Sequence, residues 1–241
     1  MNIYVMGDTH GERLRLTHPG YAVKGNLQKG DILIVCGDFG YIFMADEREK
    51  KFLDQLEKED YIILFVDGNH ENFDELYSYP VEFWRGGKIH RIRKNIFHLM
   101  RGQIFHFPEL GIRIFSMGGA YSIDKMYREP GKSWWAQEMP SEEEYDEARR
   151  NLEKADFKVD YIITHTLPEE SMSIFHPYHP EEVKLSFFLE WVRENVDYKH
   201  WYAGHLHRDE DIWRHQTLLH YDVRDLVKNI PVERNEKEDY F

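Results

Sequence analysis

Five short segments rich in metal-ligand side chains are spread along the chain, and most of them follow directly on an apolar run typical of a β-strand. They are Gly7-Asp8-Thr9-His10-Gly11, Gly37-Asp38-Phe39-Gly40, Gly68-Asn69-His70-Glu71, Thr164-His165 and Gly204-His205-Leu206-His207. Strands that end in such residues can bring them together at one edge of a sheet, as parallel strands do with their ligand-binding ends. The pattern therefore favours a sheet whose strand ends converge on a cage for two metal ions.

Strand and helix signals alternate in the first third of the chain. Three short runs of β-branched and aromatic residues stop at Gly or Asp-Gly, and they comprise residues 2–6, 31–36 and 61–66. Between the second and third runs, residues 45–60 carry Phe52, Leu53 and Leu56 at helical spacing. This βαβ pattern predicts parallel strands covered by helices.

The middle of the chain has a different pattern. Three short strands separated by Gly-containing turns predict an antiparallel meander, and they comprise residues 96–99, 103–107 and 112–117. A long irregular connection, residues 118–140, comes next. Ser141 then begins a helix that runs to about Ala155, since Glu144 completes a capping box.

The last third returns to alternating elements. Strands are predicted at 160–164, 200–203 and 217–222, and a helix at 182–195. There is no internal repeat, low-complexity tract or flexible linker. We therefore expect one α/β domain with two sheets over residues 1–230, followed by a solvated charged tail at 231–241.

Charge and cysteine content restrict the class of protein. The formal net charge of −13 argues against an extended nucleic-acid surface, but it permits a small anionic substrate because bound divalent cations add positive charge. The single cysteine, Cys36, excludes an intramolecular disulfide and fits a reducing compartment. The apolar runs are too short to span a membrane, and the N-terminus enters a strand without a signal peptide. We expect a cytoplasmic protein with no membrane partner, while the oligomeric state stays open.

The first segment offers one oxygen and one nitrogen ligand. Asp8 and His10 at this spacing suit Mn²⁺, Fe²⁺ or Zn²⁺ better than Mg²⁺ or Ca²⁺. Taken alone, Asp-x-His is as well explained by a polar turn. Asp38, at the end of the second strand, is the natural bridging carboxylate, and Asn69 adds a neutral amide oxygen.

The order Asp-x-His, Gly-Asp, Gly-Asn-His, Thr-His and Gly-His-x-His resembles the calcineurin-like metallophosphoesterase superfamily, and the resemblance extends from Asp8 to His207. It implies an α/β fold, a four-layer α/β/β/α sandwich of two mixed sheets flanked by helices, with the metals at the strand ends. The resemblance also implies two ligand sets that share Asp38. The first comprises Asp8, His10, Asp38 and His207, and the second comprises Asp38, Asn69, His165 and His205. Mn²⁺ is the expected ion, and Fe, Zn or Ni would also fit.

His70 has a different role in this resemblance, because the equivalent position protonates the leaving alkoxide. Two metals about 3.5–4 Å apart clamp the attacking and leaving oxygens and lower the pKa of a bridging water. The leaving group still needs a proton, which an imidazole can supply near neutral pH. The alternative is a plain turn histidine, but the neighbouring motifs favour the acid.

The second motif departs from the pattern Gly-Asp-x-x-Asp-Arg-Gly of many members, because Tyr41 and Ile42 replace the later Asp and the Arg. That Asp orients the catalytic histidine and that Arg grips phosphate, so other residues must replace them. Glu71, or a carboxylate elsewhere in the chain, is a candidate for orienting His70, and Arg128 is a candidate for gripping phosphate.

The connection 118–140 is the expected region of substrate selection, because connections this long are often functional. Its candidate substrate-binding residues are Tyr121, Lys125 and Arg128, and Arg13 beyond the first motif is a further one. Trp134 and Trp135 either stack on a base or anchor the loop to the core. His176 and His179 are interpreted as residues at the rim of the site.

The predicted function is a dinuclear metal-dependent phosphoester hydrolase, in which metal-bound hydroxide attacks phosphorus and His70 acts as general acid. The expected substrate is a small or nucleotide-type phosphomonoester or phosphodiester. The missing Arg argues against a protein serine/threonine phosphatase. The complete ligand set argues against a catalytically silent scaffold for protein binding, and the Gly-Asn-His segment argues against a two-metal amide hydrolase.

Overall fold

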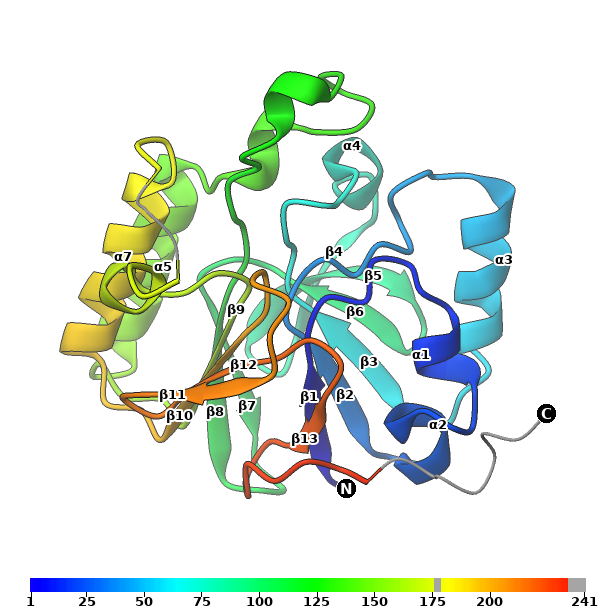
Figure 1. Ribbon diagram of the computed structural model, residues 1–241. Helices are drawn as coiled ribbons and strands as arrows, with labels where there is room; N and C mark the ends of the chain where they lie inside the picture. Colours follow the sequence, from blue (N-terminus) through cyan, green and yellow to red (C-terminus); the bar gives the residue numbers. More distant parts are fainter. Residues whose placement is uncertain (176–178, 234–241) are drawn as a thin grey trace.

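The computed structural model describes residues 1–175 and 179–233, and it contains two β-sheets packed face to face with helices on both outer sides (Figure 1). The first sheet has the strand order β13-β1-β2-β3-β6-β5-β4, and the second has the order β11-β12-β10-β9-β8-β7. Both sheets are mixed, with parallel strands in the centre and antiparallel strands at the edges. This arrangement confirms the predicted α/β/β/α sandwich.

The strands of the first sheet are β1 (Ile3–Met6), β2 (Ile32–Val35), β3 (Ile62–Phe65), β4 (Val81–Trp84), β5 (Gly87–Arg93), β6 (Ile96–Leu99) and β13 (Val223–Asp225). Those of the second are β7 (Gln103–Phe107), β8 (Ile112–Met117), β9 (Tyr161–Thr164), β10 (His200–Ala203), β11 (Glu210–Ile212) and β12 (Gln216–Leu218). The helices are α1 (Leu14–Thr17), α2 (Ala22–Asn26), α3 (Glu47–Leu56), α4 (Phe73–Leu76), α5 (Glu142–Lys154), α6 (Glu169–Met172) and α7 (Val183–Asn195), with 3₁₀ turns η1 (Lys125–Tyr127) and η2 (Ala136–Glu138).

The side chains of each strand point alternately to its two faces, and those on the inner face form the core between the sheets. In β1, Ile3 and Val5 face the second sheet, whereas Met6 packs with the helices on the outer side. In β2, Ile34 faces inward and Val35 outward in the same way. Successive side chains of a strand point to opposite faces, so strands that are buried on both faces are apolar throughout. This explains the continuous apolar runs of the sequence.

Two of the predicted helices, α3 and α5, begin at a residue whose side chain caps the helix. In α3, Asp46 accepts hydrogen bonds from the backbone nitrogens of Arg48 at 2.8 Å and Glu49 at 2.9 Å. In α5, Ser141 and Glu144 form the reciprocal capping box that the sequence predicted. Each cap satisfies backbone N–H groups that have no partner inside the helix. The capping box predicted at Ser141 is confirmed, whereas the cap at Asp46 was not predicted and the helix expected within 45–60 is shorter, at Glu47–Leu56.

The predicted meander is wrong for its first strand. β6 lies in the first sheet between β3 and β5, whereas β7 forms the edge of the second sheet and pairs with β8. The turn at residues 100–102 therefore carries the chain from one sheet to the other. Because β6 is already paired on both sides, it has no free edge for β7. The sequence pattern also did not reveal β4 and β5, the hairpin that extends this sheet.

The end of the described chain differs from the sequence prediction in two places. The predicted strand 217–222 is confirmed only at residues 217–218, which belong to β12, while residues 219–222 connect β12 to β13 in the other sheet. Residues 231–233 lie along β13, since Val232 donates its backbone N–H to Val223 at 2.7 Å. These first residues of the predicted tail therefore pack on the sheet, and 234–241 lie outside the described residues.

Within residues 1–175 and 179–233, every helix is too short or too polar to cross a membrane.

A buried ion pair between Arg101 and Asp67 contacts the end of the connection 118–140. Arg101 Nε and Nη2 donate to Asp67 Oδ2 at 2.9 and 2.5 Å, and His98 Nε2 lies 2.9 Å from Asp67 Oδ1. Burial opposes ionisation of Asp67, but the charge of Arg101 and the contact with His98 hold its pKa below the usual value. Arg101 Nη2 also donates to the carbonyls of Gln137 at 2.8 Å and Glu138 at 3.2 Å. The pair thus fixes the end of the connection to the first sheet.

Replacing Arg101 by methionine should lower the free energy of unfolding by about 3–5 kcal/mol, because it leaves the buried Asp67 charge without its main partner. Urea denaturation followed by circular dichroism measures the change. Lys50→Ala is the control, because Lys50 forms an exposed ion pair with Glu47 and such pairs contribute about 0–1 kcal/mol. Equal stability of Arg101→Met and the wild type would contradict the role of this pair.

Candidate metal centre

All five segments identified in the sequence follow the ends of parallel strands. Asp8, Asp38 and Asn69 come after β1, β2 and β3 of the first sheet, while His165 and the segment of His207 follow β9 and β10 of the second. The two sheets therefore supply side chains to one common edge. This convergence is what the fold contributes to the site.

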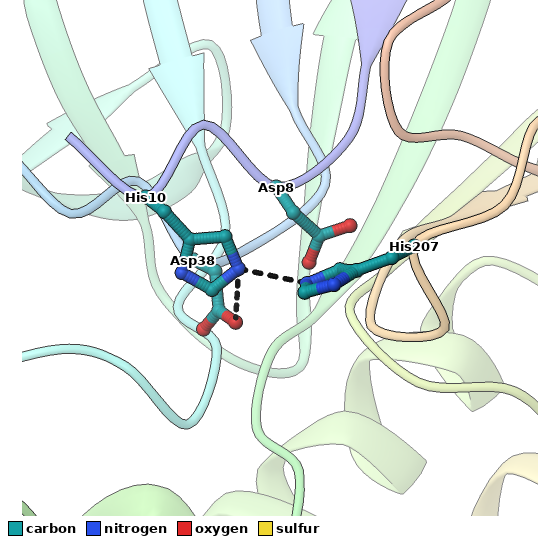
Figure 2. A group of neighbouring side chains, drawn as sticks. All are labelled: Asp8, His10, Asp38 and His207. Carbon is teal, nitrogen blue, oxygen red and sulfur yellow. Dashed lines mark hydrogen bonds and ion pairs between the residues drawn. The ribbon is translucent and has the colours of Figure 1, made fainter. Parts of the chain in front are cut away.

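Four of the predicted ligands form a compact group. Donor atoms of Asp8, His10, Asp38 and His207 all lie within 4.8 Å of one another, and Figure 2 shows the two imidazoles approaching from opposite sides. His10 Nε2 is 2.8 Å from His207 Nε2 and 3.5 Å from Asp38 Oδ2. The two carboxylates are buried and the two imidazoles are exposed. Such a mixture of oxygen and nitrogen donors fits a divalent transition metal.

The side chains predicted for a second metal lie beside this group. His165 Nε2 is 3.2 Å from Asn69 Oδ1 and 3.4 Å from Asp38 Oδ2, and its ring lies 4.9 Å from that of His205. The other ring nitrogen of His165, Nδ1, is 2.8 Å from the carbonyl oxygen of Cys36. A hydrogen bond from Nδ1–H to this carbonyl leaves the lone pair of Nε2 available, as in most metal-binding histidines.

The glycines of the motifs allow this close packing. A Cβ atom on Gly37 would lie 2.1 Å from His165 Nδ1, and one on Gly68 would lie 2.1 Å from Asp38 Oδ1. Each glycine thus makes room for a candidate ligand that belongs to a different motif. The glycines do more than permit turns, because they let the donor groups approach one another.

Several candidate ligands have an unusual backbone conformation. His10, Asp38, His205 and His207 have φ values of 45°, 48°, 68° and 50°, in the left-handed region that non-glycine residues rarely adopt. Strained conformations cost about 1–3 kcal/mol each and cluster at functional sites. At His10 the strain is supported by a hydrogen bond from its backbone N–H to the carbonyl of Asp38 at 2.8 Å.

The donor groups perturb one another's protonation. Burial raises the pKa of Asp8 to about 7. Burial acts against the charged form of His165, but the charges of Asp38 and Asp8 raise its pKa to about 10. Burial lowers the pKa of His10 to about 4. A metal must therefore displace protons from His165 and Asp8, whereas the lowered pKa of His10 leaves that ring without an extra proton near neutral pH.

His70 lies next to this group, on the residue after Asn69. Its backbone N–H donates to Asp38 Oδ1 at 2.8 Å, and its ring is 5.0 Å from that of His10. The ring atom Nε2 is 2.9 Å from Arg128 Nη2, and Asp124 Oδ2 holds that guanidinium at 2.8 and 3.0 Å. Burial lowers the pKa of His70, and the charge of Arg128 acts in the same direction while Asp38 opposes it.

Glu71 has a different position from the one expected. Its Oε1 accepts a hydrogen bond from the backbone N–H of Phe39 at 2.7 Å, and the side chain is fully buried. Glu71 therefore supports the loop that carries Asp38, and the expectation that it orients His70 is wrong. The carboxylate connected to His70 is that of Asp124, which acts through Arg128.

The other predicted substrate residues lie on two sides of His70. A cavity of about 370 Å³ is lined by Tyr121, Arg128 and His70, together with the candidate ligands Asp38, Asn69, His205 and His207. Lys125 Nζ is directed to Glu181 Oε2 at 2.5 Å. Arg13 lines a second cavity of about 490 Å³ on the side of His10.

The aromatic residues of the connection have separate roles. Trp135 is buried and donates its Nε1–H to Asp74 Oδ2 at 2.8 Å, so it anchors the loop. Tyr121 stacks on His179 at a ring distance of 4.4 Å, which places His179 beside the rim. Trp134 lies 5.5 Å from the amino group of Lys125, and His176 lies outside the described residues.

Three residues that support the site, directly or through a neighbour, were missed in the sequence. Asp124 holds Arg128, while Ser122 and Glu138 form hydrogen bonds that lead to Asn69. The i, i+4 spacing of Asp124 and Arg128 is the one available signal. Ser122 and Glu138 carry no local pattern, because the fold brings them together across 16 residues.

Carboxylates and imidazoles that meet at the strand ends of two sheets are typical of a metal-dependent hydrolase. A family model described as calcineurin-like phosphoesterase matches residues 1–209. The chain therefore belongs to the calcineurin-like phosphoesterase family, whose members are in general metal-dependent phosphoester hydrolases. No curated protein sequence matches the chain. The donor set described above fits the divalent metals that this family binds.

Lowering the pH from 8 to 6 should weaken the binding of Mn²⁺, because protons compete with the metal for Asp8 and His165, whose pKa values are raised. The apparent affinity should fall about tenfold per pH unit for each proton displaced. Isothermal titration in buffers of different ionisation enthalpy counts the released protons. An affinity that is equal at both pH values, with no proton release, would contradict the assignment. Asp8→Asn should bind Mn²⁺ more weakly and release fewer protons.

Proposed function

We propose that this protein is a dinuclear metal-dependent phosphoester hydrolase that acts on small or nucleotide-type phosphomonoesters or phosphodiesters. The observation that supports this most strongly is the position of Asp38. Its Oδ2 lies 3.5 Å from His10 Nε2 and 3.4 Å from His165 Nε2, between the two groups of donors. One carboxylate shared by two donor groups is the arrangement that a two-metal site needs.

The proposed ligands are Asp8, His10, Asp38 and His207 for one divalent ion and Asp38, Asn69, His165 and His205 for the other, with Mn²⁺ as the proposed metal. When bound, such ions polarise phosphoryl oxygens and lower the pKa of a coordinated water. The protein contributes fixed orientations. Cys36 holds His165 through its carbonyl, and the backbone N–H of His205 donates to both oxygens of Asp8 at 2.9 and 3.0 Å.

His70 is proposed as the general acid. In the free protein, its Nε2 accepts the hydrogen bond of Arg128, and this cation lowers the pKa of the ring. An anionic phosphoryl group is a better acceptor for Arg128 than a neutral imidazole. Binding of substrate would therefore draw Arg128 away, raise the pKa of His70 and free Nε2 to carry a proton to the leaving oxygen.

The cavities on the two sides of His70 support a small substrate. Their volumes of about 370 and 490 Å³ fall in the range of about 300–1,000 Å³ that is typical of small-molecule sites. Tyr121 and Ile123 give the first cavity an apolar wall. The second contains Arg13 and Arg48 together with Asp46 and Glu49, and this mixed lining suits a polar part of the substrate.

A protein serine/threonine phosphatase is less well supported. Tyr41 and Ile42, which stand where that branch has Asp and Arg, are both buried in the apolar core against α3. Neither residue supplies the carboxylate or the guanidinium that this branch uses, although Tyr41 also lines the second cavity. Arg128 reaches His70 from the opposite side, on the connection 118–140.

The direct test is hydrolysis of mono-aryl and bis-aryl phosphates and nucleotides by metal-stripped protein, with Mn²⁺, Ni²⁺, Zn²⁺ and Mg²⁺ added back separately. We expect turnover that depends on the added ion, with the strongest response to Mn²⁺. Tight metal binding without hydrolysis of any phosphoester would instead favour a scaffold that binds proteins.

His70→Ala should reduce kcat by about 10²–10⁴, the usual contribution of a general acid. The loss should be greatest for alkyl phosphates and smallest for p-nitrophenyl phosphate, whose leaving group needs little protonation. Steady-state kinetics on both substrates, with Mn²⁺ binding measured in parallel, check this. An equal loss on both substrates would show that His70 does not protonate the leaving group.

Arg128→Ala should lower kcat/KM by about 10- to 100-fold, because it removes charged hydrogen bonds to the phosphoryl group. It also removes a cation that lowers the pKa of His70. The limb of the pH profile on which activity falls with rising pH should therefore move to higher pH. Lys132→Ala in the same connection is the control, since Lys132 pairs with Glu129 at the surface. A profile that does not move would contradict the contact between Arg128 and His70.

A further inference from the structure

The orientation of the Asn69 amide decides whether this residue can bind a metal. An amide has one oxygen that can accept and one nitrogen that can only donate. Rotation of the amide by half a turn would present NH₂ to a cation in place of oxygen. A functional ligand at this position therefore needs a neighbour that distinguishes the two orientations.

Ser122 is such a neighbour. Asn69 Nδ2 donates to Ser122 Oγ at 3.1 Å, while Oδ1 lies on the side of His165 at 3.2 Å. Ser122 in turn donates twice to Glu138, from Oγ to Oε2 at 2.7 Å and from its backbone nitrogen to Oε1 at 3.0 Å. All three side chains are at least nine-tenths buried, with Ser122 and Glu138 only 1% exposed. Water therefore cannot easily replace these partners.

We propose that Ser122 and Glu138 are positioning residues that hold Asn69 Oδ1 toward the second metal. A hydroxyl has one proton, and in this geometry Glu138 accepts it. Ser122 Oγ then offers only lone pairs to Asn69, so it binds the NH₂ group and repels the amide oxygen. This inference rests on the proposed function, because it assumes that Asn69 is a metal ligand.

The position of Glu138 is itself determined by the fold. Its carbonyl oxygen accepts a hydrogen bond from Arg101 at 3.2 Å, and Arg101 is fixed by the buried Asp67. Gly119 packs against the same carbonyl, since a Cβ there would lie 2.7 Å from Glu138 O. Arg101 and Gly119 thus fix the backbone through which the connection 118–140 reaches the metal centre. The connection orients the candidate ligand Asn69 and also lines the cavity.

Glu138→Gln tests the proposal with almost no change in shape. The new amide can donate to Ser122 Oγ, which releases the hydroxyl proton toward Asn69 and favours the reversed amide. Isothermal titration of the metal-stripped protein with Mn²⁺ should then show one of two sites weakened by about 10- to 100-fold, the usual effect of losing a partner that orients a ligand. Glu129→Gln, an exposed glutamate of the same connection, should bind as the wild type does.

Asn69→Asp supplies the decisive comparison. An aspartate presents oxygen on both sides, so its orientation no longer matters, and a hydroxyl proton directed at it would be favourable. Glu138→Gln should therefore weaken Mn²⁺ binding when residue 69 is asparagine and should not weaken it in the Asn69→Asp background. Ser122→Ala should follow the same pattern, and it provides the test if Glu138→Gln does not fold.

The outcomes separate this inference from the proposed function. Two Mn²⁺ sites of unchanged affinity in both Glu138→Gln and Ser122→Ala would overturn it. So would an equal loss in the wild-type and Asn69→Asp backgrounds, since that would mean that Glu138 only supports the loop. A wild-type protein that binds two Mn²⁺ ions but hydrolyses no phosphoester would overturn the proposed activity and leave the positioning role standing.

Discussion

The buried carboxylate of Asp38 is the constraint on which the rest of the site depends. Although burial opposes its charge, the neighbouring histidines hold its pKa below the usual value. A buried charge of this kind is stable only with partners close by. Gly68 and the backbone N–H of His70 approach its oxygens, and Glu71 supports the loop that carries it. The third motif, Gly68-Asn69-His70-Glu71, thus has two roles. It supplies the candidate ligand Asn69, and its other residues surround Asp38, the candidate ligand of the second motif.

The sequence was sufficient for the parts of the structure with a local signal. Apolar runs identified the central strands, and polar residues after them identified the donor groups, because the ends of parallel strands meet at one edge. The position of β6 could not be deduced from the sequence. Its pairing with β3 and β5 depends on which strand edge of the first sheet is free, and no local pattern shows this. The contacts of Arg128 and Ser122 were also hidden, because residues 118–140 have no periodic pattern. Glu71 was misassigned because nearness in sequence to His70 did not indicate where its carboxylate points.

The connection 118–140 is attached to the core at several points along its length. Trp135 donates to Asp74, Arg101 holds the carbonyls at its end, and Ser122 meets Asn69. Figure 1 shows the tip of the connection rising above the sheets between the helices of the two outer layers. A loop fixed in this way can hold Arg128 and Tyr121 in place before substrate arrives, and preorganised sites bind and react more effectively than loosely held ones.

The candidate metal ligands follow strands of two different sheets, and this has a mechanical consequence. Asp8, Asp38 and Asn69 belong to the first sheet, whereas His165 and His207 belong to the second. An ion held by residues from both acts as a cross-link across the sandwich, and the two layers cannot separate at this edge without releasing it. Ligands that bind only the folded state stabilise it in proportion to the logarithm of their concentration. The free metal concentration would then add to the free energy with which the apolar core already holds the two layers together, independently of any substrate.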